Sequence, residues 1–288
     1  MEPFRVVVRR GDVVESTHRV HAVAVHDGKV IDAVGDPELR CFFRSSAKPF
    51  QALPLARAYG DLDDRELAIA SASHLALPEQ LEAVQLLLDR AGATEDDLEC
   101  GPEPTKLRHN CSGKHAGMLA VCRARGWEFE GYRLAGHPVQ ESCRVELAAA
   151  AQVDDMATAI DGCGVVTFAL TLERMAHAFS RLESLDAGVR VAAAMRAHPE
   201  LIRGPGQPDT VLMQLLPGWT AKGGAEALFC AVSPDGPGVV VKVEDGGSRA
   251  VGPGVAAFLA RLGNEVPELA QTPLRNSRNE LVGTVRVD

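Results

Sequence analysis

The chain has 288 residues, of which 46% are hydrophobic and 24% charged, with a formal net charge of −9. This composition is typical of a globular protein with a full core, and an acidic chain without a basic cluster argues against a nucleic-acid partner. Its apolar runs fall short of the roughly 18 residues that a membrane span needs, and its N-terminus has a strand pattern rather than that of a signal peptide. Seven cysteines without an export signal indicate reduced thiols, so we expect a cytoplasmic protein with no membrane partner.

The predicted elements begin with strands and continue with helices. Short β-branched segments and a turn at Asp27-Gly28 predict antiparallel strands within residues 4–34. Helices are predicted from near Ser46 or Lys48 to Tyr59, and over residues 78–91, 113–125, 137–151, 170–182 and 187–197. Strands follow at 226–232 and 238–244, and a helix at 254–261. We therefore predict one α+β domain spanning 1–288, with an antiparallel sheet built from both chain ends (about 1–40 and 210–288) and a helical block (about 45–200).

The first chemical motif is Ser45-x-x-Lys48, where an apolar run gives way to a helix. A serine and a lysine three residues apart share one helical face, and a desolvated lysine can activate a serine without a histidine. Serine β-lactamases and penicillin-binding proteins use this arrangement. Lys222-Gly223-Gly224 resembles their later Lys-Thr-Gly strand, where glycine lets a substrate approach the backbone closely. The alternatives are a helix-capping serine with a solvated lysine, and a surface lysine before a bulge.

A second cluster of reactive side chains opens the helix predicted at 113–125. Cys111 lies at its N-terminus, where the helix end favours the thiolate, and Cys163 lies in a glycine-flanked turn. Two thiolates, a nitrogen ligand and water would satisfy a tetrahedral zinc, and spacing alone favours His115 or His109 as the nitrogen ligand. The alternatives are ordinary buried thiols, or a Cys111 nucleophile paired with His115.

Together these segments resemble the thermolabile, Rhizobium-type L-asparaginases. The matching blocks occur in order at residues 14–18, 44–51, 73–74, 109–115, 161–165, 172–176 and 221–226, and His-Asn-Cys-Ser-Gly-Lys-His and Asp-Gly-Cys-Gly are the most specific. The resemblance implies a serine β-lactamase-like fold, a homodimer, and hydrolysis of L-asparagine to aspartate and ammonia.

The resemblance also implies roles for individual residues. Ser45 and Lys48 match the nucleophile pair, and Lys222 matches the lysine of a second Ser-Lys tandem. The ligands of a zinc ion map onto Cys111, Lys114 and Cys163, which replaces the histidine favoured by spacing. We expect Lys222 to stabilise the oxyanion, Asp161 to bind the substrate α-amine, and Arg44 or His115 to bind its carboxylate. Further substrate contacts are expected from Ser73, His74, Asn110 and Gly223.

One segment departs from the family's pattern. After Ser-His the family reads Ser-Gly-Glu, with its serine assigned to the second tandem, whereas this chain has Leu75, Ala76 and Leu77. Leucine can neither transfer a proton nor attack a carbonyl. Two alternatives to an asparaginase therefore stay open. One is a hydrolase of glutamine or another small amide, and the other is a non-catalytic amino-acid-binding homologue.

Overall fold

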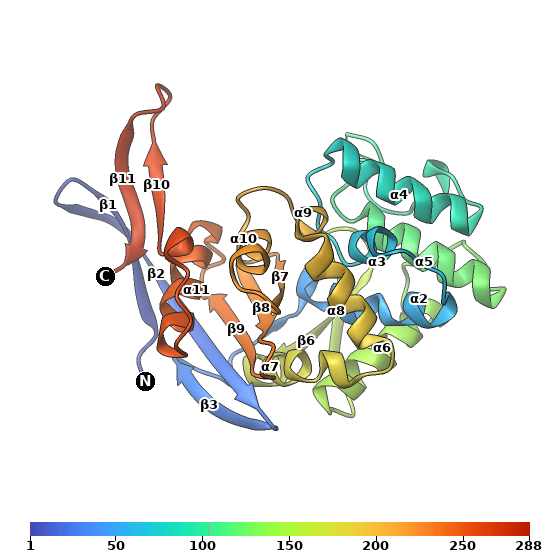
Figure 1. The fold of residues 1–288 in the computed structure, drawn as a ribbon, viewed down its shortest axis with the longest axis horizontal. Helices are drawn as coiled ribbons and strands as arrows, with labels where there is room; N and C mark the ends of the chain where they lie inside the picture. Colours follow the sequence, from blue (N-terminus) through green and yellow to red (C-terminus); the bar gives the residue numbers. More distant parts are fainter. Residues whose placement is uncertain (103) are drawn as a thin grey trace.

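Figure 1 shows the fold in a computed structural model that describes residues 1–102 and 104–288. The main sheet has the strand order β10-β11-β1-β2-β9-β8-β7, with β3 also paired to β2. The strands are β1 (Phe4–Arg10), β2 (Val13–His26), β3 (Lys29–Val34), β7 (Thr220–Gly224), β8 (Leu228–Val232), β9 (Gly238–Val243), β10 (Gln271–Arg275) and β11 (Leu281–Val287). These pairings are antiparallel and join the two chain ends, which confirms the predicted α+β architecture.

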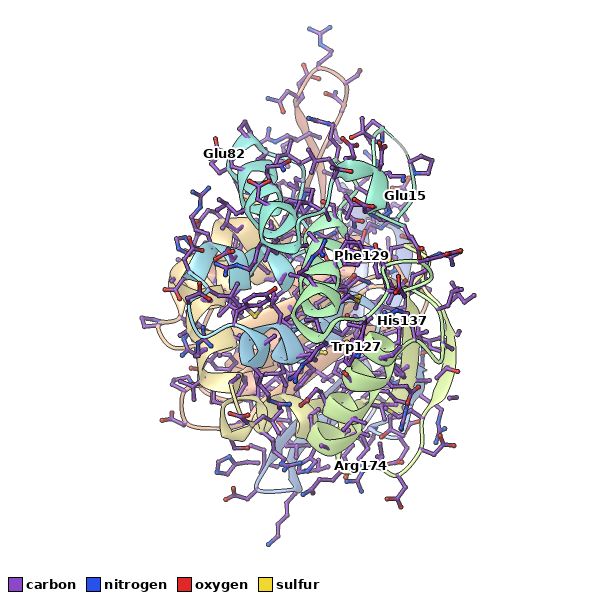
Figure 2. All side chains as sticks on the ribbon, turned by 90° about the vertical axis from the view of Figure 1, so that its right-hand side faces the viewer. Glu15, Glu82, Trp127, Phe129, His137 and Arg174 are labelled. Atoms are coloured by element: carbon purple, nitrogen blue, oxygen red, sulfur yellow. The ribbon has the colours of Figure 1, made fainter. Side chains whose placement is uncertain are left out.

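The middle of the chain forms the helical block on the right of Figure 1. Its helices are α1 (Lys48–Gln51), α2 (Leu53–Ala58), α3 (Asp64–Ala70), α4 (Pro78–Ala91), α5 (Ser112–Arg125), α6 (Pro138–Ala151), α8 (Gly188–Ala197) and α9 (Pro199–Ile202), with a 3-10 turn η1 (Arg44–Ala47) before α1. A small sheet of β4 (Arg40–Phe42), β6 (Val166–Thr171) and β5 (Ala157–Ile160) adjoins it. Figure 2 views this side of the molecule, where Trp127, Phe129 and His137 mark the segment between α5 and α6. None of the helices in the described part of the chain is long and apolar enough to cross a membrane.

Two helices cover opposite faces of the main sheet. Gly238 of β9 packs so closely on α7 (Leu172–Ser180) that a Cβ there would lie 2.0 Å from the carbonyl oxygen of Ala176. On the other face, a Cβ on Gly254 of α11 (Val251–Arg261) would meet Val20 at 2.8 Å. Strands covered on both faces read as continuous apolar runs, which explains the fully buried β8 and β9. A further helix, α10 (Pro208–Leu215), packs against β7 at the edge of the sheet.

The structure corrects two sequence predictions and adds two strands. The first predicted helix is divided into α1 and α2 around Ala52, and each piece has a proline in its first turn, where no backbone donor is needed. The helix predicted at 170–182 begins at Leu172, because residues 166–171 form β6 and the Thr171 hydroxyl accepts the Arg174 amide at 3.3 Å. The strands β10 and β11 of the C-terminal hairpin were not predicted individually, although they lie within the 210–288 segment assigned to the sheet.

Candidate active site

The candidate site lies where η1, which leads into α1, meets β7 at the junction of the sheet and the helical block. The Ser46 hydroxyl donates to the carbonyl oxygen of Lys222 at 2.9 Å. A Cβ on Gly224 would lie 2.9 Å from Ser46 Oγ, so glycine at this position permits the close approach. This contact brings the Ser45–Lys48 segment beside Lys222, as the sequence predicts for two parts of one site.

One hydroxyl is shared by two lysines. Ser73 Oγ lies 3.0 Å from Lys48 Nζ and 3.0 Å from Lys222 Nζ, and these three residues are at most 1% exposed. Lys48 also donates to the carbonyl oxygen of Ala72, and Lys222 donates to that of Gly223 at 2.6 Å. A serine hydroxyl has one proton and two lone pairs, so it can accept from one amine while it donates to the other. Ser73 is therefore able to pass a proton between Lys48 and Lys222.

Ser45 occupies a different position from the one expected. It is partly exposed, and its carbonyl oxygen accepts the backbone amide of Lys48. Over residues 1–102 and 104–288, no side-chain hydrogen bond joins Ser45 to Lys48, whose amine is directed to Ser73 and Ala72 instead. The structure therefore brings the two predicted lysines together around Ser73, with Ser45 one turn before Lys48 and partly exposed.

Burial shifts both lysines toward their neutral forms. It lowers the pKa of Lys222 to about 7, with Asp209 opposing the shift and Lys48 adding to it. Burial also lowers the pKa of Lys48, against the effect of the Cys111 thiol. An amine that gives up its proton near neutral pH is suited to general-base catalysis.

Asp209 is a residue of this site that the sequence analysis missed. It lies in the first turn of α10 and is 2% exposed. Its Oδ2 accepts the backbone amide of Gly223 at 3.0 Å and lies 3.8 Å from Lys222 Nζ. In the sequence, an acidic residue after Gln207-Pro208 indicates only a favourable first turn of a helix, so no local signal singled it out.

The predicted zinc ligands also converge. Cys111, Lys114 and Cys163 are each 4% exposed, and Lys114 Nζ donates to Cys163 Sγ at 3.0 Å. A hydrogen bond with Cys163, together with Lys48 and Lys114, holds the pKa of Cys111 well below its usual value. Burial acts to lower the pKa of Lys114, but the two neighbouring thiols outweigh it and raise that pKa.

Two sulfurs and one amine form a donor set that zinc accepts, with a fourth position for water or substrate. No group of three or more His, Cys, Asp or Glu side chains in the described residues is arranged to hold a metal, so a metal here would depend on Lys114. Its binding would have to displace the Lys114 proton that the thiols favour. The histidines favoured by spacing have other contacts, since His109 Nδ1 accepts the Cys111 amide at 3.1 Å and His115 Nδ1 lies 2.6 Å from the Tyr132 hydroxyl.

The two residues expected to bind the charged ends of the substrate bind each other. Arg44 Nε donates to Asp161 Oδ1 at 2.6 Å, and the same oxygen accepts the amide of Gly162 at 2.7 Å. Burial opposes the charge of Asp161, but Lys114 and Arg44 lower its pKa. Asn110 is exposed next to Cys111. An amino acid carries an ammonium group and a carboxylate group. The ammonium group can replace Arg44 beside Asp161, and the carboxylate can replace Asp161 beside Arg44.

His74 is fully engaged within the protein. Its Nδ1 accepts the Ala76 amide at 3.1 Å, so its proton is on Nε2, which lies 2.8 Å from Ser112 Oγ. The Ser112 hydroxyl in turn donates to the Leu107 carbonyl at 2.7 Å. Burial lowers the pKa of His74 to about 3. The structure therefore places His74 beside the site, holding the start of α5 in position.

Leu75 lies away from the paired lysines. Its side chain is 49% exposed and covers Gly204, where a Cβ would approach it to 2.8 Å. Its backbone amide donates to Gln80 Oε1 at 2.9 Å. The departure from the family pattern at residue 75 therefore leaves the contacts of Ser73 with Lys48 and Lys222 in place.

This chemistry agrees with the comparison of the chain with known families. The family model of L-asparaginase II matches residues 6–287, nearly the whole sequence. The chain belongs to the L-asparaginase II family. Membership of this family supports an amide hydrolase, while no curated protein sequence matches the chain significantly.

The chain also has distant likenesses among solved structures. They include a β-lactamase from Sphaerobacter thermophilus (17% identity, 87% of this chain and 94% of that chain covered, TM-score 0.45). A penicillin-binding protein homologue from Pyrococcus abyssi is 11% identical, covers 85% of this chain and 74% of its own, and has a TM-score of 0.39. A glutaminase from Bacillus subtilis is 14% identical, with 86% and 89% covered and a TM-score of 0.40.

Proposed function

We propose that the protein hydrolyses L-asparagine to L-aspartate and ammonia through a serine acyl-enzyme. The observation that carries the proposal is the pair of buried lysine amines, each 3.0 Å from the hydroxyl of Ser73, in a member of the L-asparaginase II family. Amide hydrolysis needs a nucleophile, a neutral base and a cation for the oxyanion, and two lysines of lowered pKa can supply the base and the cation.

In this mechanism Ser45 attacks the side-chain amide carbon, and Lys48 removes its proton. Ser45 is the better nucleophile candidate because it is partly open to solvent, whereas Ser73 is 1% exposed between the two amines. Catalytic hydrogen bonds are often incomplete before a substrate binds, so we expect the Ser45–Lys48 contact to form in the complex. Ser73 then relays protons between the lysines, and ammonia leaves with a proton from this relay. Water, activated by Lys48, hydrolyses the acyl-enzyme.

Substrate orientation is proposed to rest on the Arg44–Asp161 pair. Asp161 would bind the α-ammonium group in place of Arg44, and Arg44 would bind the α-carboxylate in place of Asp161. Zinc held by Cys111, Lys114 and Cys163 would supply a Lewis acid that orients a substrate oxygen. Metal content measured on purified Cys163→Ser protein should fall relative to the unmodified chain, and equal zinc content would contradict this ligand set.

The decisive experiment compares Ser45→Ala with Ser73→Ala. Ammonia release is measured with L-asparagine and L-glutamine, and a diazo-ketone analogue of asparagine labels the nucleophile for peptide mass spectrometry. We expect label on Ser45 and a loss of at least about 1,000-fold in turnover in Ser45→Ala, because the attacking atom is removed. Label on Ser73 would exchange the roles of the two serines. Faster turnover of glutamine, or calorimetric binding of asparagine without ammonia release, would support one of the two alternative functions instead.

A further inference from the structure

Asp209 is placed to control the charge of Lys222. In the part of the chain that the structure describes, it is the only carboxylate within ion-pair distance of this amine, at 3.8 Å, and both side chains are at most 3% exposed. A buried ammonium group without a compensating anion strongly favours its neutral form. Asp209 is therefore the group that opposes the loss of the Lys222 proton most directly.

We propose that Asp209 is a positioning residue that keeps Lys222 cationic and directed at Ser73, and that it thereby sets the upper pH limit of the reaction. The part of this inference that concerns the reaction rests on the proposed role of Lys222 as the cation that stabilises the oxyanion. The part that concerns the charge of Lys222 rests on the contacts of Asp209 alone.

One carboxylate oxygen holds both the amine and its strand. Asp209 Oδ2 accepts the Gly223 amide at 3.0 Å, and the Gly223 carbonyl accepts from Lys222 Nζ at 2.6 Å. A Cβ on Gly223 would lie 3.2 Å from the same oxygen, so glycine allows α10 to approach the strand this closely. The peptide of residues 222–223 and the lysine amine are thus fixed together, with the amine 3.0 Å from Ser73 Oγ.

The other groups around Lys222 do not replace Asp209. The cations Lys48 of α1 and Arg203 of the segment before α10 both lower its pKa, and Cys111 at the start of α5 only partly offsets them. On β8, Cys230 lies opposite Lys222 in the strand register, and burial raises the pKa of this thiol well above its usual value, so it stays neutral. From η1, the contact is the uncharged hydroxyl of Ser46.

The test is Asp209→Asn, which keeps the shape of the side chain and an oxygen for the Gly223 amide but removes the charge. Loss of a nearby anion lowers the pKa of a lysine, so the alkaline limb of the kcat profile should move to lower pH by at least about 1 unit. Turnover at pH 8 should then fall about tenfold, with little change in KM. Asp209→Glu should restore part of the shift, because it returns the charge.

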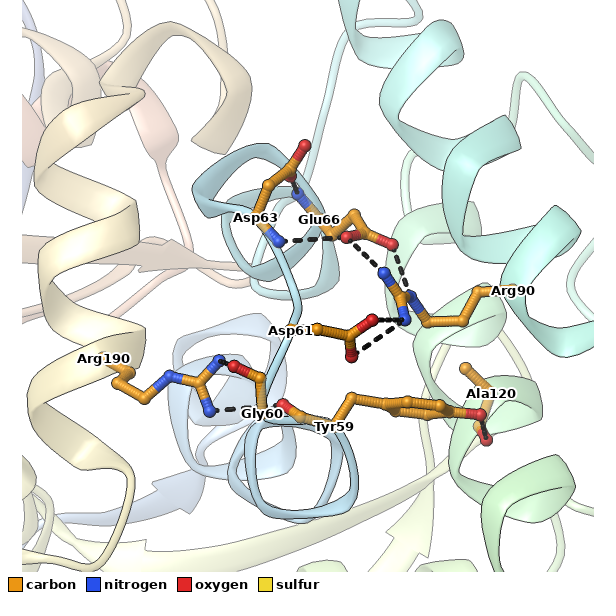
Figure 3. A network of polar contacts seen from close by, with 8 residues as sticks. All are labelled: Tyr59, Gly60, Asp61, Asp63, Glu66, Arg90, Ala120 and Arg190. Atoms are coloured by element: carbon orange, nitrogen blue, oxygen red, sulfur yellow. Dashed lines mark hydrogen bonds and ion pairs between the residues drawn. The ribbon is translucent and has the colours of Figure 1, made fainter.

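Glu66→Gln is the matched control. Glu66 is a buried carboxylate that pairs with Arg90 in the network of Figure 3, away from the site, at 2.7 Å. Its replacement by the neutral amide should leave the alkaline limb where it is. An equal shift in Glu66→Gln and Asp209→Asn would show that the pH profile reports general stability, and would overturn the proposal.

A second readout does not depend on catalysis. The chain has six lysines, so the 13Cε resonance of Lys222 in lysine-labelled protein can be assigned by its loss in Lys222→Met, and its pH midpoint followed by NMR. We expect a lower midpoint in Asp209→Asn than in the unmodified chain. A shifted midpoint in a protein that releases no ammonia would support the charge control and refute the asparaginase. A neutral Lys222 at pH 6 in the unmodified chain, or a midpoint that Asp209→Asn does not move, would overturn the inference.

Discussion

Gly113→Ala should disturb the site through the packing of α5 on α3. Gly113 lies between Cys111 and Lys114, and a Cβ there would lie 2.2 Å from the carbonyl oxygen of Ile69. Since real Cβ contacts are essentially never shorter than 3.0 Å, the helices must separate by at least 0.8 Å (3.0 minus 2.2) at this point. Overpacking of this kind costs up to about 3 kcal/mol, and the better helix propensity of alanine offsets about 1 kcal/mol. We therefore expect the free energy of unfolding to fall by about 2 kcal/mol.

The displaced end of α5 carries two of the proposed zinc ligands, so turnover should fall as well, by up to about 100-fold for a shift near 1 Å. Scanning calorimetry should show a Tm lower by about 3 °C for a chain of this size. Gly60→Ala is the matched control, because a Cβ there meets nothing within 4 Å, and Gly117→Ala should be intermediate, with its nearest neighbour the Ala70 Cβ at 3.2 Å. Wild-type Tm and turnover in Gly113→Ala would refute the close packing of α3 and α5.

Three further predictions concern the Glu66–Arg90 ion pair, the protonation of His74, and Leu75, the residue that departs from the family's pattern. Among the described carboxylates, Glu66→Gln leaves the largely buried Arg90 paired with the exposed Asp61 alone, so the free energy of unfolding measured in urea should fall by about 2 kcal/mol. Breaking the exposed Arg65–Glu82 pair with Arg65→Ala should cost under about 1 kcal/mol. Equal losses in the two variants would contradict the argument from burial. The pKa of His74 is 6.5 in the unfolded chain and about 3 in the folded one, so on acidification the unfolded chain binds this proton first. The free energy of unfolding should therefore decline between pH 6.5 and pH 3, by up to about 5 kcal/mol. Unfolding measured across this range should show a smaller decline in His74→Gln, and an unchanged slope would exclude this contribution. Leu75→Ser should alter turnover of L-asparagine by no more than about twofold, because residue 75 is half exposed and away from the lysines; a large gain in the ammonia assay would show that a serine is needed there.

Elements with a one-sided apolar pattern could be predicted from the sequence. The helices at 78–91 and 137–151 agree with α4 and α6 to within one residue, because their buried side chains recur at helical spacing. The helix at 113–125 also agrees with α5 to within one residue, although residues 112–122 are all buried. β6 could not be distinguished in this way. Its residues 166–170 are all buried, and a short continuous apolar run fits a strand or a helix equally well. Apart from the buried Val285, the residues of β10 and β11 are exposed or half-buried, so their sequence carries little apolar alternation.

The site was predictable as a set of residues but not as a set of contacts. Ser45 and Lys48 were paired because they are neighbours in the sequence, whereas the amine of Lys48 extends to Ser73 and Ala72, which follow α3. A lysine side chain has four rotatable carbons, so the buried acceptors within its reach decide its direction, and these come from distant segments. Asp209 was missed for the same reason, since its partner is on a strand that the chain reaches only later.

The three buried lysines of the site have different electrostatic surroundings, and these assign different states of charge to them. Three ammonium groups in one low-dielectric site would repel one another, so each needs an anion or must lose its proton. Lys114 Nζ lies 3.0 Å from Cys163 Sγ, and Cys111, whose pKa is held well below its usual value, also raises the pKa of Lys114. Lys222 has the carboxylate of Asp209 at 3.8 Å. Lys48 instead donates to a carbonyl and a hydroxyl, and burial lowers its pKa despite the Cys111 thiol. Lys48 is therefore the amine best placed to be neutral and to take a proton from a serine. Lys114 keeps its charge unless a metal displaces its proton, and Lys222, whose pKa burial lowers to about 7, keeps its charge below that pH.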